Sequence, residues 1–188
     1  MSNIFIISGP SGAGEDSVIK KLKDFINFDK VVTTTTRAMR PEDKEGVSYY
    51  FVTKEEFERG IEENKFFEYA LEDNGNYYGG TYAELERVKK SNNPVIWKVE
   101  YQGVIAGKKI LPEAKSIFIY IPFEMIEKRL KARGESEKVI NSRLSYAKGW
   151  YENEEIFDYK VLNEEGKLDE TVKKVAEIIK SNLNDKLS

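Results

Sequence analysis

The chain has 188 residues and a formal net charge of −3, which suits one domain and excludes a global basic field for nucleic acid. It contains no cysteine and no histidine, which excludes disulfides, thiol catalysis, a Ser-His-Asp triad and the usual zinc sites. Its first apolar stretch is too short for a signal peptide, and no run approaches the roughly 20 apolar residues of a spanning helix, so we expect a cytoplasmic protein with no membrane or nucleic-acid partner.

The chain opens with an expected strand, glycine turn and helix. Residues 3–8 are short, apolar and β-branched, which predicts a buried strand. Residues 9–14 form a glycine-rich turn, and residues 16–28 carry apolar side chains at helical spacing. A phosphate-binding loop requires this order of elements.

The next tract, about residues 32–81, has a different character. Residues 31–52 have β-rich ends around a polar, charged loop. Thr53 and Glu56 have the spacing of a capping box at the start of a helix. Two short strands follow around Asp73-Asn74-Gly75, and residues 81–91 look helical. We interpret this tract as a β-rich insertion.

Strands and helices alternate through the rest of the chain. Strands are expected at 94–103, 116–121 and 159–163. Helices are expected at 102–110, 123–134, 136–155 and 168–184. Alternation of this kind implies an α/β fold with a parallel sheet flanked by helices on both faces.

We expect a single domain over residues 1–188 with three parts. The core takes about 1–31, 82–123 and 151–188. The insertion takes about 32–81, and a helical lid takes about 124–150.

The glycine turn carries the first candidate site. Residues 8–18 read SGPSGAGEDSV, against the phosphate-loop pattern Gly-x-x-x-x-Gly-Lys-Ser/Thr. Gly9 and Gly14 fit, but Glu15 stands at the lysine position and Asp16 at the hydroxyl position. Backbone N–H groups at the helix start would cradle phosphate oxygens. The alternative is a strand-to-helix turn that needs glycine for close packing.

Two groups of arginines form further candidates. Arg37 and Arg40, before Pro41, suit a phosphate monoester because each guanidinium offers two parallel donors. Arg129 and Arg133 share one helix face, with Arg143 on the next helix, as in a lid that closes over a transferring phosphoryl group. Solvated surface charge, balanced by nearby acids, is the alternative for both groups.

Glu68 and Glu100 lie in otherwise apolar or aromatic surroundings, in the segments FFEYA and WKVEYQG. A carboxylate can accept hydrogen bonds from the N1–H and N2–H₂ groups of guanine. Two such carboxylates favour a base pocket over the alternative, a salt bridge to one of the arginines.

Together these segments resemble the guanylate kinase family over nearly the whole chain. The matching segments are SGPSGAG (8–14), TTRAMRP (35–41), GVSYYFV (46–52), EEFERGIEENKFFEYA (55–70), GNYYGG (75–80), YQG (101–103), KRLKARG (128–134), VINSRLS (139–145) and DYKVLN (158–163). The resemblance implies a P-loop kinase that phosphorylates GMP to GDP with ATP and Mg²⁺.

The resemblance also implies residue roles. It places the GMP phosphate at Thr33, Arg37, Arg40, Tyr49 and Tyr78, and the guanine at Glu68 and Glu100. It assigns the transferring phosphoryl group to Arg129, Arg133 and Arg143, and the ATP phosphates to the loop residues Gly9, Ser11, Gly12, Ala13, Gly14 and Ser17. One small departure is Gly80, where many members carry Ser or Thr and where Thr81 is a possible substitute.

The larger departure is a paired reversal of charge. The family usually has an acidic residue two positions before the second base-reading carboxylate, and this chain has Lys98 there. We hypothesise that Lys98 supplies the positive charge lost at position 15, while Glu15 and Asp16 bind Mg²⁺.

Three alternatives stay open. Glu15 and Lys98 could form a salt bridge in a dead donor site, which would leave a binding module for a phosphorylated ligand or peptide. A kinase for a phosphorylated sugar is also conceivable, although it would not need Glu68 and Glu100. The sequence leaves open whether the chain is a monomer or a homodimer.

Overall fold

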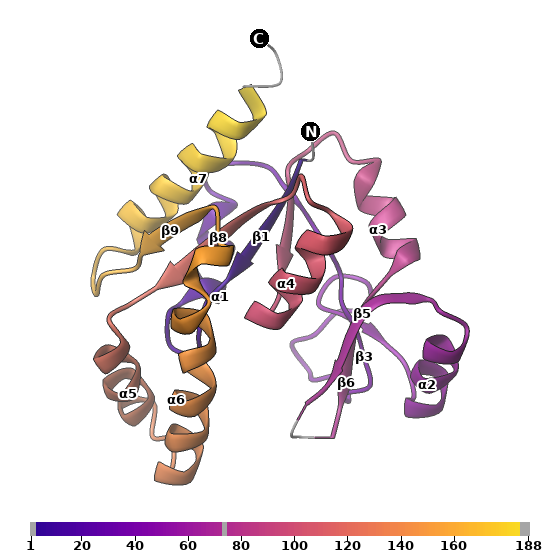
Figure 1. The fold of residues 1–188 in the computed structure, drawn as a ribbon, viewed down its shortest axis with the longest axis horizontal. Coiled ribbons are helices and arrows are strands. Elements are labelled where there is room, and N and C mark those ends of the chain that lie inside the picture. Colours follow the sequence, from indigo (N-terminus) through magenta and orange to yellow (C-terminus); the bar gives the residue numbers. More distant parts are fainter. Residues whose placement is uncertain (1–2, 73–74, 185–188) are drawn as a thin grey trace.

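The computed structural model describes residues 3–72 and 75–184, so the expected turn at Asp73-Asn74 lies outside the described residues. It contains two β-sheets and the helices around them (Figure 1). Among the described residues, no helix has the length and apolar character that crossing a membrane requires.

The larger sheet has five strands in the order β2-β7-β1-β8-β9, and every neighbouring pair is parallel. These strands are β2 (Asp29–Lys30), β7 (Val95–Lys98), β1 (Ile4–Ser8), β8 (Lys115–Tyr120) and β9 (Tyr159–Leu162). The sheet and its helical cover confirm the expected α/β fold.

Helices cover both faces of this sheet. One face packs against α1 (Glu15–Leu22) and α7 (Leu168–Asn184), through residues such as Val18 and Val175. The other face packs against α3 (Tyr82–Lys89) and α4 (Tyr101–Ile110), through residues such as Val88 and Val104. Because both faces are covered, all five residues of β1 are buried.

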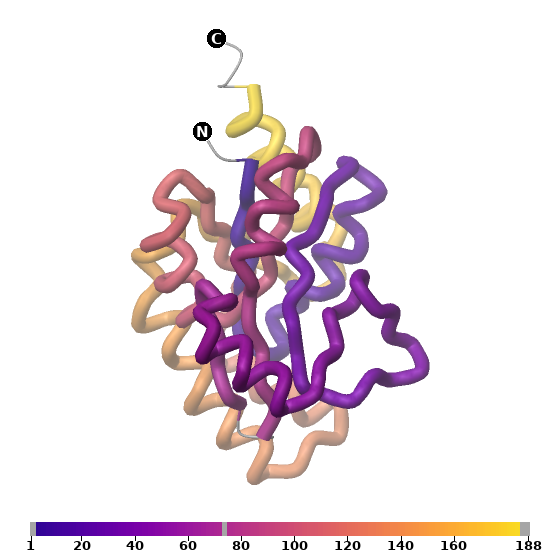
Figure 2. The backbone as a smooth tube through the Cα atoms, turned by 90° about the vertical axis from the view of Figure 1, so that its right-hand side faces the viewer, coloured from indigo at the N-terminus to yellow at the C-terminus, as the bar shows by residue number. Residues whose placement is uncertain are grey.

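The smaller sheet has four strands in the order β4-β3-β6-β5 and lies beside the first (Figure 1). Its strands are β4 (Tyr50–Phe51), β3 (Thr34–Thr35), β6 (Tyr77–Thr81) and β5 (Phe66–Leu71). Helix α2 (Lys54–Glu62) begins with the expected capping box and packs Phe57 on Phe66 at 4.1 Å between ring centroids. The segment between β3 and β4 projects from the body (Figure 2).

Two helices, α5 (Phe123–Ala132) and α6 (Glu137–Glu152), extend below the larger sheet (Figure 1). They share a small core of their own with Ile121, which includes Leu130 and Ile140. A short 3₁₀ turn, η1 (Glu154–Ile156), then leads to β9. The α5–α6 pair and the four-stranded sheet lie on opposite sides of the view in Figure 1, with the glycine turn between β1 and α1 in the five-stranded part.

Three expected elements are wrong at their ends. The helix expected at 16–28 stops at Leu22. Phe25 and Ile26 still pack on the core, but from turns, so the apolar spacing continues beyond the end of the helix. The helix expected at 136–155 gives way to η1 after Glu152.

The strand expected at 94–103 is also shorter, because β7 ends at Lys98. Lys98 pairs with Ile7, and β1 ends one residue later at Ser8. Residues beyond Lys98 therefore have almost no β1 residues left as pairing partners. Glu100 is therefore the N-cap residue of α4 and not a strand neighbour of Lys98.

Candidate active site

The glycine loop joins β1 to α1 at the carboxyl end of the parallel sheet. Gly14 is the N-cap of α1 and has φ = 88°, a left-handed conformation that favours glycine. A side chain at Gly9 would place its Cβ 2.4 Å from the carbonyl oxygen of Ile119, so this turn also needs the absence of a Cβ. Both glycines that fit the phosphate-loop pattern are thus explained by backbone geometry.

Side chains from distant elements hold the loop. Arg129 donates to the carbonyl oxygen of Gly12 at 3.0 Å and to that of Asn163 at 3.3 Å. Arg143 donates to the hydroxyl of Ser11 at 3.0 Å and also forms an ion pair with Glu135 at 3.0 Å. Two of the three expected lid arginines therefore meet at the loop, whereas Arg133 is exposed at the C-terminal end of α5.

Asn163 is a loop contact that the sequence patterns did not single out. Its side chain is buried, donates to the carbonyl oxygen of Ala13 at 2.7 Å and accepts from the Thr171 hydroxyl at 3.1 Å. The position directly after β9 was the available signal, since ends of parallel strands gather at one edge of a sheet.

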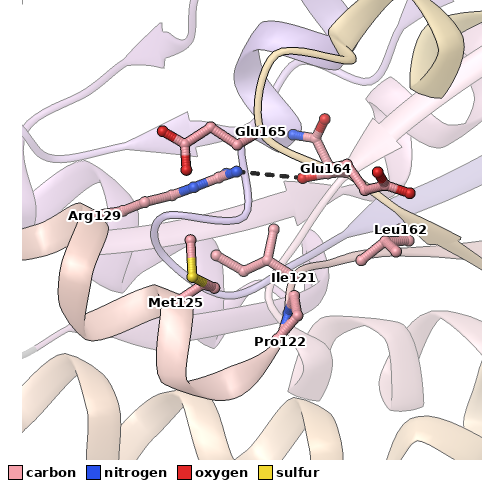
Figure 3. A pocket seen from close by; sticks show the side chains of 8 residues that line it. Ile121, Pro122, Met125, Arg129, Leu162, Glu164 and Glu165 are labelled. Atoms are coloured by element: carbon pink, nitrogen blue, oxygen red, sulfur yellow. Dashed lines mark hydrogen bonds between the residues drawn. The ribbon is translucent and has the colours of Figure 1, made fainter.

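A cavity of about 320 Å³ opens beside the loop. Figure 3 shows its apolar wall, with Met125 of α5 near Ile121, and Arg129 reaching toward the segment after β9. The lining residues are Ile121, Pro122, Met125, Arg129, Leu162, Asn163, Glu164 and Glu165. An apolar wall with a few polar groups at its rim is typical of small-molecule sites.

Lys98 reaches across from β7 to the first turn of α1. Its Nζ lies 2.7 Å from Oδ1 of Asp16 and 3.7 Å from Oε1 of Glu15. Burial by itself would lower the Lys98 pKa, but the two carboxylates raise it above its usual value. Burial raises the pKa of Glu15, and Lys98 opposes that shift. The lysine is therefore a charged group at the mouth of the glycine loop, and the exposed Ser17 follows on the same turn.

The second group of candidate residues lies on the four-stranded sheet. Arg37 forms an ion pair with Asp43 at 2.8 Å, and its guanidinium lies 5.2 Å from the ring centroid of Tyr49. The rings of Tyr49 and Tyr78 are 5.9 Å apart. These side chains therefore form one patch beside the projecting loop.

Two other residues of this group lie on the same loop and strand edge. Arg40 is exposed, and its backbone N–H donates to Asp43, which is the first cause of the lowered Asp43 pKa. Thr33 is half-buried, and its carbonyl oxygen accepts from the backbone N–H of Tyr50 at 2.9 Å.

The two candidate base-reading carboxylates are both shifted toward the neutral form. Loss of solvent around the Glu68 carboxylate raises its pKa to about 7. A hydrogen bond of 2.9 Å from the backbone N–H of Gly80 opposes this rise. Loss of solvent also raises the pKa of Glu100 to about 7. The negative charges of Glu15 and Glu72 add to this rise. Glu100 nevertheless remains exposed to solvent, so its shift is worth less in free energy than its size suggests.

The glycine at position 80 has a steric cause. A Cβ there would lie 2.4 Å from the Phe67 ring, so Ser or Thr would not fit without a shift of that ring. The hydroxyl of the neighbouring Thr81 accepts from the backbone N–H of Glu84 as the cap of α3.

Among residues 3–72 and 75–184, no group of three or more carboxylate, His or Cys side chains is arranged to hold a metal ion. Glu15 and Asp16 form a two-carboxylate set instead, and the charged Lys98 already contacts it. Mg²⁺ often takes one or two carboxylates and completes its shell with water and phosphate oxygens. The donor chemistry therefore fits a magnesium ion that arrives with a phosphate ligand.

A parallel sheet whose first strand feeds a glycine loop and a helix defines the class of P-loop α/β proteins. A family model described as guanylate kinase matches residues 1–182, and the chain belongs to the guanylate kinase family.

Relatives and solved structures agree with this assignment. The chain is 40% identical over 184 residues to a guanylate kinase of Haemophilus influenzae, covering 95% of this chain and 88% of that protein. It is 41% identical over 167 residues to a guanylate kinase of Shewanella violacea, covering 87% and 80%. The crystal structure of guanylate kinase from Anaplasma phagocytophilum is similar with a TM-score of 0.73 and 31% identity, covering 95% and 85%.

Proposed function

We propose that this protein transfers the γ-phosphoryl group of ATP to GMP, forming ADP and GDP, with a donor site rebuilt around Lys98. Family membership supports the reaction. The observation that carries the rebuilt donor site is the position of the Lys98 ammonium, 2.7 Å from Asp16 at the start of α1. A cation at this place can take over the charge that the loop lacks at position 15.

On the acceptor side, the GMP phosphate would bind to Thr33, Arg37, Arg40, Tyr49 and Tyr78. Arg37 is already oriented by Asp43 and Tyr49. The side chains of this ion pair are only 14% and 11% exposed, so a phosphate would have to compete with Asp43 for the guanidinium, and a dianion carries the greater charge for that competition. The guanine would donate its N1–H and N2–H₂ groups to Glu68 and Glu100, which offer both oxygens as acceptors only when ionised.

On the donor side, backbone N–H groups of the glycine loop and the start of α1 would bind the ATP phosphates, at Gly9, Ser11, Gly12, Ala13, Gly14 and Ser17. The cavity of about 320 Å³ would take the adenine. Arg129 and Arg143 now contact the loop, so they can turn to the transferring group with short side-chain movements, joined by Arg133.

Glu15 and Asp16 would hold Mg²⁺ together with ATP oxygens. The ion, when bound, neutralises charge on the phosphates. The chain's own contribution is to place Lys98 beside these phosphates and to keep Glu15 partly buried against it. Because phosphoryl transfer depends chiefly on positioning and charge, no general base is required.

The proposal includes a division of labour among three parts of the chain. Residues of about 32–81 would bring the acceptor, and residues of about 124–150 would close over the donor. Closure of both parts on the core would exclude water and suppress ATP hydrolysis. These substrates are found in the cytoplasm, so the proposal places the protein there.

The test is to measure GDP formation from ATP, Mg²⁺ and GMP, with AMP, CMP and ribose 5-phosphate as alternative acceptors. We expect turnover with GMP and a fall of about 100-fold or more in kcat for Lys98→Met, as for removal of a charge-stabilising group. Lys108→Met is the matched control, because Lys108 forms an ion pair with Asp158 at 2.5 Å in another part of the fold.

Binding of GMP without any turnover would contradict the proposal and support a binding module with a dead donor site. Full activity of Lys98→Met would contradict the role of Lys98 alone.

A further inference from the structure

Glu84 is a buried carboxylate in the first turn of α3, outside the residues assigned above to either substrate. Only 3% of the residue is exposed. It lies next to the buried Leu85 and one turn before Val88, so it occupies a core position of its helix. A buried charge is costly unless it is paired and hydrogen-bonded, so its contacts explain its presence.

The carboxylate accepts hydrogen bonds from three separate segments. Oε1 accepts from the backbone N–H of Val32 at 2.7 Å and from Nη2 of Arg87 at 2.7 Å. Oε2 accepts from Nε of Arg87 at 2.8 Å and from the hydroxyl of Tyr50 at 3.3 Å. Arg87 also donates to the carbonyl oxygen of Lys30 at 2.8 Å. The pair is bidentate, which gives it a fixed geometry.

These contacts lie where the chain passes between the two sheets. It leaves the five-stranded sheet after Lys30 and enters the four-stranded sheet at Thr34. It returns where β6 ends at Thr81 and α3 begins at Tyr82. The Glu84–Arg87 pair thus ties the outgoing segment to the returning one, and we refer to these five hydrogen bonds as the crossing clamp.

The crossing clamp also lies directly behind the proposed acceptor site. Val32 precedes Thr33, and Tyr50 follows Tyr49, in segments joined by the hydrogen bond from Tyr50 N–H to the Thr33 carbonyl. Adjacent residues of an extended segment point to opposite sides. The Tyr50 side chain contacts the clamp from one side, so Tyr49 can face a ligand on the other, and the backbone N–H of Val32 fixes the segment that leads into Thr33.

We infer that Glu84 and Arg87 are positioning residues that set the four-stranded sheet, and with it the GMP phosphate site, relative to the glycine loop. This inference rests on the proposed function for its effect on GMP. Its structural part, a narrowly defined angle between the two sheets in the ligand-free protein, does not depend on catalysis.

The test measures the distance between the sheets directly. Because the chain has no cysteine, spin labels can be attached to Glu62→Cys in α2 and Lys173→Cys in α7, both at exposed positions. Pulsed electron paramagnetic resonance then gives the distance distribution with and without GMP. We expect Glu84→Gln to broaden the distribution of the ligand-free protein, because the amide cannot keep the bidentate pair.

Kinetics give a second reading of the same variant. We expect the KM for GMP to rise about tenfold in Glu84→Gln, with kcat and the KM for ATP within about twofold of the parent, as for an effect on the acceptor site alone. Glu86→Gln is the matched control, since Glu86 on the same helix pairs with Lys89 at 2.9 Å on the exposed surface. That variant should match the parent in both measurements.

Arg87→Lys guards against loss of folding in Glu84→Gln, because it keeps a positive charge beside the buried carboxylate while losing the two-point contact. It should broaden the distance distribution at a nearly unchanged Tm. Distributions as narrow as the parent's in both variants would overturn the clamp. Since this measurement needs no turnover, it decides the clamp even in a protein that makes no GDP.

Discussion

The two ends of the candidate active site have opposite arrangements of charge at the places where we propose that phosphates bind. On the four-stranded sheet, Arg37 and Arg40 come from one loop and the balancing Asp43 lies between them in space. At the glycine loop, the acids are in the loop helix and the cation comes from the next strand. Under the proposed function, the comparison teaches that a backbone cradle would fix where phosphate binds, whereas the countercharge could come from a different element.

Apart from the Lys98 variants, the largest effect should come from the acceptor end. We expect Arg37→Ala to lower kcat/KM for GMP by about 100-fold, because charge-assisted hydrogen bonds to phosphate contribute about 1.5–3 kcal/mol each. The KM for ATP should stay near the parent value, as steady-state kinetics with either substrate varied will show. Arg59→Ala, at an exposed position in α2 of the same sheet unit, is the control. An equal loss in both variants would argue against a phosphate contact at Arg37.

A smaller effect is expected at the donor end from Asn163→Ala. Removing this side chain leaves the Ala13 carbonyl oxygen without the 2.7 Å bond and costs about 1–3 kcal/mol of unfolding free energy. We also expect the KM for ATP to rise about tenfold while the KM for GMP is unchanged.

The control for that variant is Asn182→Ala, which removes hydrogen bonds to Tyr159 and Ile178 near the C-terminal end of α7, whereas the contact with Asn163 lies near its start. It should lower stability, measured by urea denaturation, without changing the KM for ATP. A raised KM for ATP in both variants would mean that stability alone, not the loop contact, is being measured.

The smallest effect is a dependence of GMP binding on pH. With pKa values of about 7, Glu68 and Glu100 are mostly protonated at pH 6 and mostly ionised at pH 8. Since only the ionised form offers both oxygens to the two guanine donors, the affinity for GMP should rise with pH by less than about tenfold, chiefly through the less exposed Glu68. Calorimetric titration across this range should show the rise, and Glu68→Gln should flatten it. An affinity that falls with pH would contradict the base-reading role.

The same shifts give the sign for stability. Between pH 4.5 and 7 the folded protein binds more protons at Glu68 than the unfolded chain, because its folded pKa is raised from 4.5 to about 7. Its contribution therefore favours the folded state below pH 4.5 and is lost as pH rises through 7. Glu68→Gln should make the pH dependence of Tm less steep over this interval.

Local signals in the sequence were enough for much of the fold. The terminal helix follows the predicted residues 168–184, and the capping box at Thr53 marks the start of α2. Alternating strands and helices sufficed for a parallel α/β sheet. These features depend on neighbours in the chain, which is why sequence reasoning reaches them.

Local signals could not predict features that depend on residues far away in the sequence. Asn163 contacts a loop 150 residues away, and Glu84 contacts Val32 52 residues away. Glu84 did leave a trace, an acid beside the apolar positions Leu85 and Val88 of an amphipathic helix. The end of β7 at Lys98 was likewise set by where β1 stops, which the sequence of β7 does not contain.

The central claim, that Lys98 replaces the charge missing at position 15, is tested most directly by exchanging the pair. GDP formation should be measured for the parent, Glu15→Lys, Lys98→Glu and the double variant. We predict that Lys98→Glu loses about 100-fold or more in kcat, that Glu15→Lys, which supplies the missing cation directly, loses less, and that the double variant recovers at least about tenfold over Lys98→Glu, because charges in contact are strongly coupled. Losses that simply multiply in the double variant, or a Lys98→Glu variant as active as the parent, would contradict the account.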